Sequence, residues 1–211
     1  MNITKFGHCC LLIEENGRRI ITDPGTYSSG QDEAQRIDLI VISHAHQDHF
    51  SLPSVKKILE NNPQAIIVTN KEVGTQLDKE GIAYISIEDG ESTEQAGITI
   101  EGFGTDHAAI YGAYPGSANT GYFIAEKLFF PGDAFVMPNK PVEILALPIA
   151  GPWMKIAEAI DYAKVIKPKT TFPIHEAMMK NPEFMNPLIT KLLEAEGVTF
   201  VGLEIGKETA F

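Results

Sequence analysis

Residues 43–49 read Ser-His-Ala-His-Gln-Asp-His and directly follow an apolar run. The segment places His44, His46, Asp48 and His49 within six positions. Imidazole nitrogens and carboxylate oxygens are the ligands that zinc and similar divalent ions prefer. In an extended segment His44 and His46 point to the same side and can bind one ion together. If the chain then turns towards a helix, Asp48 and His49 can face a second ion. The alternative is a cluster of solvated surface histidines, which is disfavoured because dense polar groups cost free energy unless something coordinates them.

Three further polar groups stand just past apolar, strand-like runs, as His44 does. These groups are His107, Asp133 and His175. Taken singly, each histidine would be read as structural and Asp133 as a turn residue after Pro-Gly. Ligands in α/β folds gather where strands end, so the segment at 43–49 favours a shared rim instead. The sequence therefore predicts that all these groups meet at one metal site.

The apolar patterning predicts the elements that must position these groups. Strand-like and helix-like runs alternate in the first half, which is typical of an α/β layered fold. After residue 92 the pattern becomes richer in strands, and the chain reads as two similar halves with two sheets face to face and helices outside. The predicted strands are 9–14, 18–22, 37–42, 65–69, 83–87, 98–103, 120–125, 127–130, 143–147, 170–174 and 198–201. The predicted helices are 51–61, 70–79, 154–166 and 186–196.

Composition limits the classes of function. The chain has 211 residues, of which 44% are hydrophobic, and this apolar content is enough for the core of one domain over 1–211. The same content is compatible with a homo-oligomer. A formal charge of −11 disfavours binding to nucleic acid or to anionic membranes. No signal-peptide core or transmembrane run is present, and the adjacent Cys9 and Cys10 are better suited to a core than to a disulfide. A reducing cytoplasm is the expected location.

The motif resembles that of the metallo-β-lactamase superfamily, with His44-x-His46-x-Asp48-His49 followed by a lone histidine, Gly-Asp and a late histidine. Residues 7–14 (Gly-His-Cys-Cys-Leu-Leu-Ile-Glu) and 147–151 (Leu-Pro-Ile-Ala-Gly) resemble the ascorbate-phosphate lactonase-like branch. The resemblance implies a four-layered αββα sandwich with two divalent ions at one edge. It also implies a division of the ligands between the two ions. The first ion would take His44, His46 and His107, the second Asp48, His49 and His175, and Asp133 would bridge both.

Two positions bear on the metal and the pocket. The second histidine of the motif is present as His46, where diiron oxygen-reducing relatives typically carry a carboxylate, so the resemblance favours a hydrolytic enzyme. Zinc is the expected metal, with manganese, iron and nickel as alternatives, because ligand type biases metal choice. Phe50 stands where many members have a small residue, which predicts a differently shaped pocket floor.

The predicted chemistry is hydrolysis. Two ions roughly 3.5–4 Å apart would hold a bridging water, supply hydroxide near neutral pH and stabilise the oxyanion that forms. Asp48 would orient that hydroxide and shuttle a proton to the leaving group. The resemblance also makes His8 a second catalytic candidate, which would contact substrate or a metal-bound oxygen; the alternative is a histidine bonded to a loop carbonyl. Asp23 closes a strand before Pro-Gly, and the resemblance implies that it supports the metal loop.

The expected substrate is a small ester-like molecule: a lactone, ester, thioester or phosphodiester. An RNA- or DNA-processing phosphodiesterase is the alternative enzyme, although the acidic charge argues against it. A metal-holding sensor without turnover is the alternative from another class. Loop residues Tyr111, Tyr114, Asn119 and Trp153 are candidates for a substrate pocket, or are ordinary loop side chains. No cluster of Lys or Arg marks a phosphate site.

Overall fold

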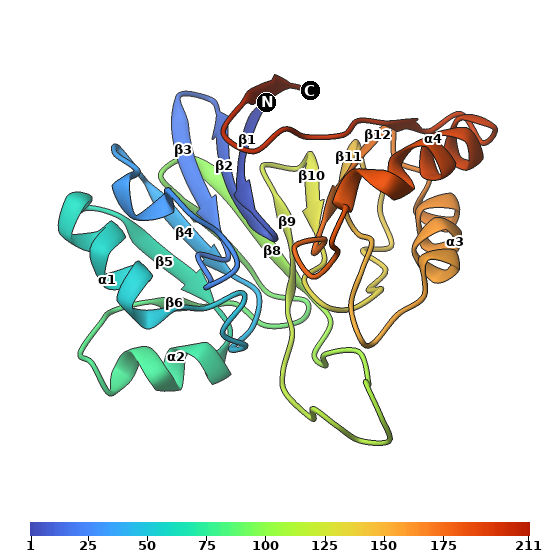
Figure 1. Ribbon diagram of the computed structural model, residues 1–211. Helices are drawn as coiled ribbons and strands as arrows, with labels where there is room; N and C mark the ends of the chain where they lie inside the picture. Colours follow the sequence, from blue (N-terminus) through green and yellow to red (C-terminus); the bar gives the residue numbers. More distant parts are fainter.

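Two mixed seven-stranded sheets lie face to face in the computed structural model, which describes residues 1–211. Helices α1 and α2 cover the outer face of one sheet, and α3 and α4 that of the other (Figure 1). The four-layered αββα sandwich predicted from the sequence is therefore confirmed. The helices are α1 (Leu52–Asn61), α2 (Lys71–Asp78), α3 (Ile156–Ile166) and α4 (Asn186–Glu194), with 3₁₀ turns η1 (Gln31–Glu33) and η2 (Pro182–Met185).

Each sheet combines an antiparallel and a parallel part. The first sheet runs in the order β14 (Glu208–Ala210), β1 (Asn2–Gly7), β2 (Cys10–Glu15), β3 (Arg18–Thr22), β4 (Leu39–Ile42), β5 (Ile66–Thr69), β6 (Ile85–Ser86). The second runs β13 (Thr199–Phe200), β12 (Thr170–Ile174), β11 (Ile144–Pro148), β10 (Leu128–Phe130), β9 (Gly121–Ile124), β8 (Ile98–Phe103), β7 (Ser92–Gln95). Strands β3 to β6 are parallel, as are β10 to β13. The two halves of the chain thus repeat one plan.

Three apolar layers hold the sandwich together. The central one fills the space between the sheets, and each of the others joins a sheet to its pair of helices. Cys9 packs into the central layer and Cys10 into the layer under α1 and α2, and neither forms a disulfide. Neighbouring residues on a strand point to opposite faces, so the two cysteines fill two different cores, as the sequence predicted.

Strand ends set the position of the site. Polar residues leave β1, β3, β4, β8, β10 and β12 at their carboxyl ends, which gather at one edge of the sandwich. Asn70 begins α2 near this edge, and its side-chain oxygen accepts the Val73 N–H at 3.1 Å. This cap supplies a partner to a backbone donor that the helix leaves free. The helix end is thereby fixed beside the loop that carries His44 and His46.

The structure departs from the sequence prediction at edges and ends. The predicted strand at 83–87 forms only the two residues of β6, and the predicted helix at 154 begins at Ile156. Strands β1, β7 and β14 were not predicted, and the residues of β7 and β14 are mostly polar and exposed. None of the four helices combines the length and the apolar character needed to cross a bilayer.

Candidate metal centre

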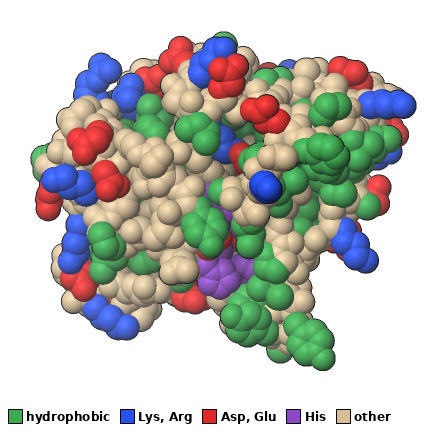
Figure 2. All heavy atoms as spheres, viewed as in Figure 1, with side chains coloured by type: hydrophobic (Ala, Val, Ile, Leu, Met, Phe, Trp, Pro, Cys, Tyr) green, Lys and Arg blue, Asp and Glu red, His purple; other side chains and the backbone are tan.

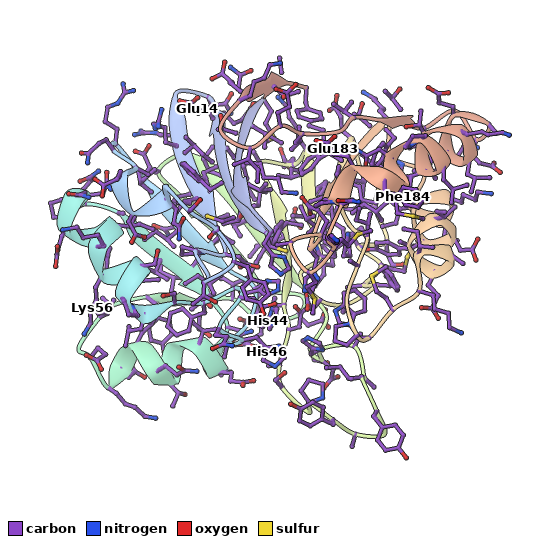
Figure 3. The ribbon with its side chains drawn as sticks, viewed as in Figure 1. Glu14, His44, His46, Lys56, Glu183 and Phe184 are labelled. Atoms are coloured by element: carbon purple, nitrogen blue, oxygen red, sulfur yellow. The ribbon has the colours of Figure 1, made fainter.

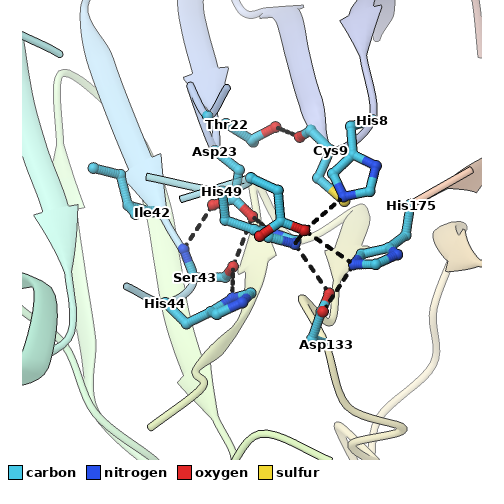
Figure 4. Close-up of polar contacts among 12 residues, drawn as sticks. His8, Cys9, Thr22, Asp23, Ile42, Ser43, His44, His49, Asp133 and His175 are labelled. Carbon is cyan, nitrogen blue, oxygen red and sulfur yellow. Dashed lines mark hydrogen bonds and ion pairs between the residues drawn. The ribbon is translucent and has the colours of Figure 1, made fainter. Parts of the chain in front are cut away.

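Seven predicted ligands converge at the edge where the two sheets meet. Figure 3 labels His44 and His46 among them, and Figure 4 shows His44, His49, Asp133 and His175. His44, His46, Asp48 and His49 come from the loop between β4 and α1. The other three follow strands of the second sheet and are His107, Asp133 and His175. His8 joins them from the tight turn between β1 and β2. All of these groups are buried except His46 and Asp48, which are partly exposed.

The first group consists of His44, His46 and His107. Each offers one ring nitrogen, and these nitrogens lie within 4.8 Å of one another. The ring centroids are 4.8 Å apart for His44 and His46, and 4.7 Å for His46 and His107. This is the arrangement that three imidazoles around one cation need. It is also the division of ligands that the resemblance implied for the first ion.

The second group consists of His8, Asp48, His49 and His175, again with ligand atoms within 4.8 Å of one another. The Asp48 Oδ2 atom is 3.2 Å from His8 Nε2 and 3.7 Å from the Nε2 atoms of both His49 and His175. The sequence assigned three of these residues to the second ion. The structure adds His8, which packs against the His175 ring at a centroid distance of 4.1 Å.

Asp133 lies between the two groups. Its Oδ2 atom is 3.2 Å from His107 Nε2 and 2.8 Å from His175 Nε2, and its Oδ1 atom is 3.2 Å from His49 Nε2. The carboxylate also accepts the Trp153 indole N–H at 3.0 Å. A carboxylate that contacts both groups is placed as the resemblance implied for a bridging ligand.

Hydrogen bonds on the far side of three imidazoles decide which nitrogen faces the centre. Asp23 Oδ2 accepts from His49 Nδ1 and from Ser43 Oγ, both at 2.6 Å, and Ser43 Oγ is 2.9 Å from His44 Nδ1 (Figure 4). His107 Nδ1 donates to its neighbour's carbonyl at 2.6 Å. These bonds turn Nε2 towards the centre, and the Nε2 atoms of His44 and His49 are buried without a hydrogen-bond partner. Buried nitrogens left bare in this way fit a divalent cation, because metal-bound histidines are held so by their other nitrogen.

Burial and charge shift the ionisation of the site. Burial and the neighbouring His49 charge hold the pKa of His44 well below its usual range. His49 is buried too, but Asp133 and other neighbours outweigh that effect and hold its pKa well above the ordinary value. Burial opposes ionisation of Asp133, yet His49, His107 and His175 keep its pKa well below the usual range. The centre therefore pairs an anionic carboxylate with the positive charge of His49, and a cation bound there would take the place of the His49 proton.

The centre opens into a cavity of about 260 Å³. Figure 2 shows histidine at the surface in this hollow, beside a projecting lobe of apolar side chains. The lining residues are His46, Gln47, Asp48, His107, Ile110, Tyr114, Asp133, Pro152, Trp153, His175 and Met178. Tyr114 and Trp153, two of the predicted pocket candidates, line it, whereas Tyr111 and Asn119 do not. Asn119 instead bonds the backbone of Asp133 at 2.9 Å. A larger cavity of about 620 Å³, beside η2, contains none of the seven predicted ligands.

Sequence reasoning anticipated the support from Asp23 but missed two contacts. The sequence gives no sign that the Ser43 hydroxyl links Asp23 to His44. The Trp153 bond to Asp133 joins residues twenty positions apart and leaves no local signal. Gly151 permits it, because a Cβ there would lie 2.7 Å from the indole nitrogen.

The fold and the centre define a class of protein, and comparison with known proteins agrees with it. A family model described as the beta-lactamase superfamily domain matches residues 2–175, so the chain belongs to this family. The chain is 35% identical to protein Rv0786c of Mycobacterium tuberculosis over 184 residues, which cover 85% of each chain. It is 28% identical to a UPF0173 metal-dependent hydrolase of Thermoplasma acidophilum, over 83% of each.

Solved structures share the fold. Igni18, a metallo hydrolase from Ignicoccus hospitalis, superposes with a TM-score of 0.81 at 22% identity and covers 100% of this chain and 97% of its own. An isothiocyanate hydrolase from Delia radicum gut bacteria gives a TM-score of 0.74 at 16% identity, covering 100% and 99%. The family and its named relatives make the protein a metal-dependent hydrolase, which confirms the enzyme class predicted from the sequence.

Proposed function

We propose that the protein is a dinuclear hydrolase that cleaves a small ester-like molecule, such as an ester, lactone, thioester or phosphodiester. The observation that carries the proposal is the pair of ligand groups with Asp133 between them. His44, His46 and His107 would hold one cation, and Asp48, His49 and His175 the other. Zinc is the expected metal, and manganese, iron and nickel have similar donor preferences. Bound there, such cations supply a nucleophile derived from water at neutral pH and stabilise the negative charge that develops.

Asp48 is placed to move the proton. Its side chain lines the cavity and is 19% exposed, whereas the other proposed ligands apart from His46 are almost fully buried. Burial opposes its ionisation, but the hydrogen bond with His8 and the nearby His49 charge lower the pKa of Asp48 to about 2. An ionised carboxylate at the cavity wall can accept a proton from the attacking water and deliver it to the leaving oxygen.

His8 serves to position Asp48. Burial lowers the pKa of His8 to about 4, so the ring is neutral at physiological pH. Its Nε2 atom then donates to Asp48 Oδ2, while Nδ1 is buried without a partner. The turn between β1 and β2 holds His8 in a left-handed conformation with φ 51°, which aims the ring into the centre.

The decisive experiment pairs elemental analysis with a hydrolase substrate panel. We expect about two ions per chain after gentle purification with added zinc, and turnover of at least one ester, lactone, thioester or phosphodiester. One ion or none would contradict the dinuclear centre. Turnover of none of these substrates by the fully loaded protein would favour a sensor, and tight RNA binding in a low-salt gel-shift assay would favour the nuclease instead.

The proposed location is the cytoplasm. Cys9 and Cys10 are both buried free thiols, and burial raises the pKa of Cys9 to about 12. Thiols held neutral in this way are poor nucleophiles and give no structural disulfide. Alkylation of the native protein with iodoacetamide should leave both unmodified, whereas the unfolded protein should react at both.

A further inference from the structure

The cavity beside the centre has two chemically different walls. One wall is the proposed metal cluster. The other is built from three loops that are far apart in the sequence and contribute Ile110, Tyr114, Trp153 and Met178. These loops follow β8, β11 and β12. A molecule whose reacting group meets the cluster must therefore lay the rest of its surface against apolar side chains.

The arm formed by residues 104–120 carries half of this apolar wall. It projects from the sandwich between β8 and β9 (Figure 1). The base of the arm is fixed, because His107 belongs to the centre and the backbone N–H of His107 donates to the Ser117 carbonyl at 3.0 Å. Near its tip the Ile110 N–H donates to the Tyr114 carbonyl at 2.8 Å. The arm therefore links the position of one proposed ligand to the position of an aromatic side chain over the cavity.

The apolar wall is partly uncovered. Tyr114 is 65% exposed and Met178 is 51% exposed, whereas Trp153 is held by Asp133 and packs on Phe135 at a centroid distance of 5.1 Å. Exposed apolar side chains grouped around a polar site mark a place where a ligand or partner is bound. The volume of about 260 Å³ is slightly below the usual range for drug-sized ligands, so the occupant is small.

The charge of the cavity restricts the occupant further. None of the lining residues is Lys or Arg, so the positive charge in the cavity would be that of the proposed cations alone. A phosphate or carboxylate remote from the cleaved bond would lie against the apolar wall without a cationic side chain to pair with. An uncharged substrate meets no such penalty.

We propose that the substrate is a small uncharged ester or lactone whose alkyl or aryl group binds between Tyr114, Trp153 and Met178. The inference rests on the proposed function and narrows it. In the reaction the acyl carbon–oxygen bond breaks, the oxygen of water bonds to the acyl carbon, and a proton passes to the leaving oxygen. A lactone thus gives a hydroxy acid, and an ester gives an acid and an alcohol.

The test is a series of γ-lactones with alkyl chains of increasing length, assayed with the zinc-loaded protein. We expect kcat/KM to rise about fourfold for each added methylene until the cavity is filled, which corresponds to the transfer free energy of a buried methylene. Tyr114→Ser should flatten this rise. Tyr111→Ser is the matched control, because this side chain belongs to the same turn, is 87% exposed and does not line the cavity, and it should keep the wild-type rise.

A binding assay separates this inference from the proposed function. Trp153 is the one tryptophan of the chain and lines the cavity, so its fluorescence reports occupancy by 2-alkylcyclopentanones, which are lactone analogues that cannot be hydrolysed. Affinity that rises with chain length supports the apolar binding site independently of turnover. If every lactone and ester then fails as a substrate, the proposed function and the assignment of the substrate as an ester or lactone are wrong, and only the apolar binding site stands. Turnover with no dependence on chain length, or with preference for an anionic phosphodiester such as bis-p-nitrophenyl phosphate, would overturn the inference and leave the hydrolase intact. Ketone affinity that is independent of chain length would overturn it as well.

Discussion

Replacing Asp23 by Asn should weaken metal binding without touching a proposed ligand. Asp23 is fully buried, and its Oδ1 atom accepts the Ser43 N–H at 2.7 Å. Its Oδ2 atom accepts from Ser43 Oγ and His49 Nδ1, both at 2.6 Å. An amide that keeps the first bond presents an NH₂ group to the other two. Because NH₂ cannot accept a hydrogen bond, His49 must move its proton to Nε2, the nitrogen that faces Asp133.

The magnitude follows from this loss. Partners that fix the tautomer of a metal-bound histidine are worth about 10–100-fold in metal affinity, or about 1.4–2.8 kcal/mol. We expect the second cation to bind more weakly by this factor. The group of His44, His46 and His107 should keep most of its affinity, because Ser43 Oγ can still accept from His44. The free energy of unfolding without metal should fall by about 1–3 kcal/mol, the cost of an unsatisfied buried donor.

The assay is calorimetric titration of zinc against a competing chelator, supported by elemental analysis after dialysis. Asp38→Asn is the matched control, since Asp38 accepts from Arg18 and from the Arg19 N–H at the opposite end of the β3–β4 pair. The control should bind both cations as the wild type does. If Asp23→Asn also retained both with unchanged affinity, the argument that Asp23 sets the His49 tautomer would be wrong.

Three further results are expected. Asp48→Ala should lower kcat/KM by about 10²–10⁴-fold, as expected for loss of a proton-transfer group, while the circular dichroism melt shows a folded protein; full activity would refute the role. Gly151→Ala should displace the Trp153 indole, shift its fluorescence and weaken zinc binding about tenfold, and an unchanged emission spectrum would contradict this. Burial opposes ionisation of Glu15, but the hydrogen bond from Lys127 at 2.5 Å outweighs this effect and holds the pKa of the Glu15 carboxyl below its ordinary value. The pair therefore stabilises the folded protein at pH values above the pKa of the unfolded state, and this contribution is lost as the pH falls. Glu15→Gln should therefore lower the unfolding free energy by about 1 kcal/mol at pH 7, and urea titrations should show this difference shrinking as the pH falls below the ordinary glutamate pKa of about 4.3.

The four layers of the fold could be predicted from the sequence because long apolar runs determine the strands and helices that form them. The strand that ends at Ile42 is buried along its whole length and could be recognised from composition alone. Strand β7, Ser92–Gln95, is polar, and only its pairing with β8 at the sheet edge makes it a strand. Edge strands of this kind depend on a neighbour rather than on their own residues, so local patterning misses them.

The candidate metal centre could likewise be predicted only in part. Histidine and aspartate just after apolar strands gave a signal that the chain itself carries, and the structure brings those side chains together, while their role as metal ligands stays a prediction that the zinc titrations test. The contacts of Ser43 and Trp153 had no such signal. Each depends on the distance between loops that only the folded sandwich determines.

The proposed ligands are shared between the two sheets: His44, His46, Asp48 and His49 come from the first half of the chain, and His107, Asp133 and His175 from the second. A bound cation would then cross-link the two sheets at one rim, in addition to the apolar layer between them and the pairing of β14 with β1. Each factor of ten in free metal above the dissociation constant adds about 1.4 kcal/mol of stability. Loss of the metal would therefore remove one of the connections between the two sheets, so the ions would contribute to the stability of the fold.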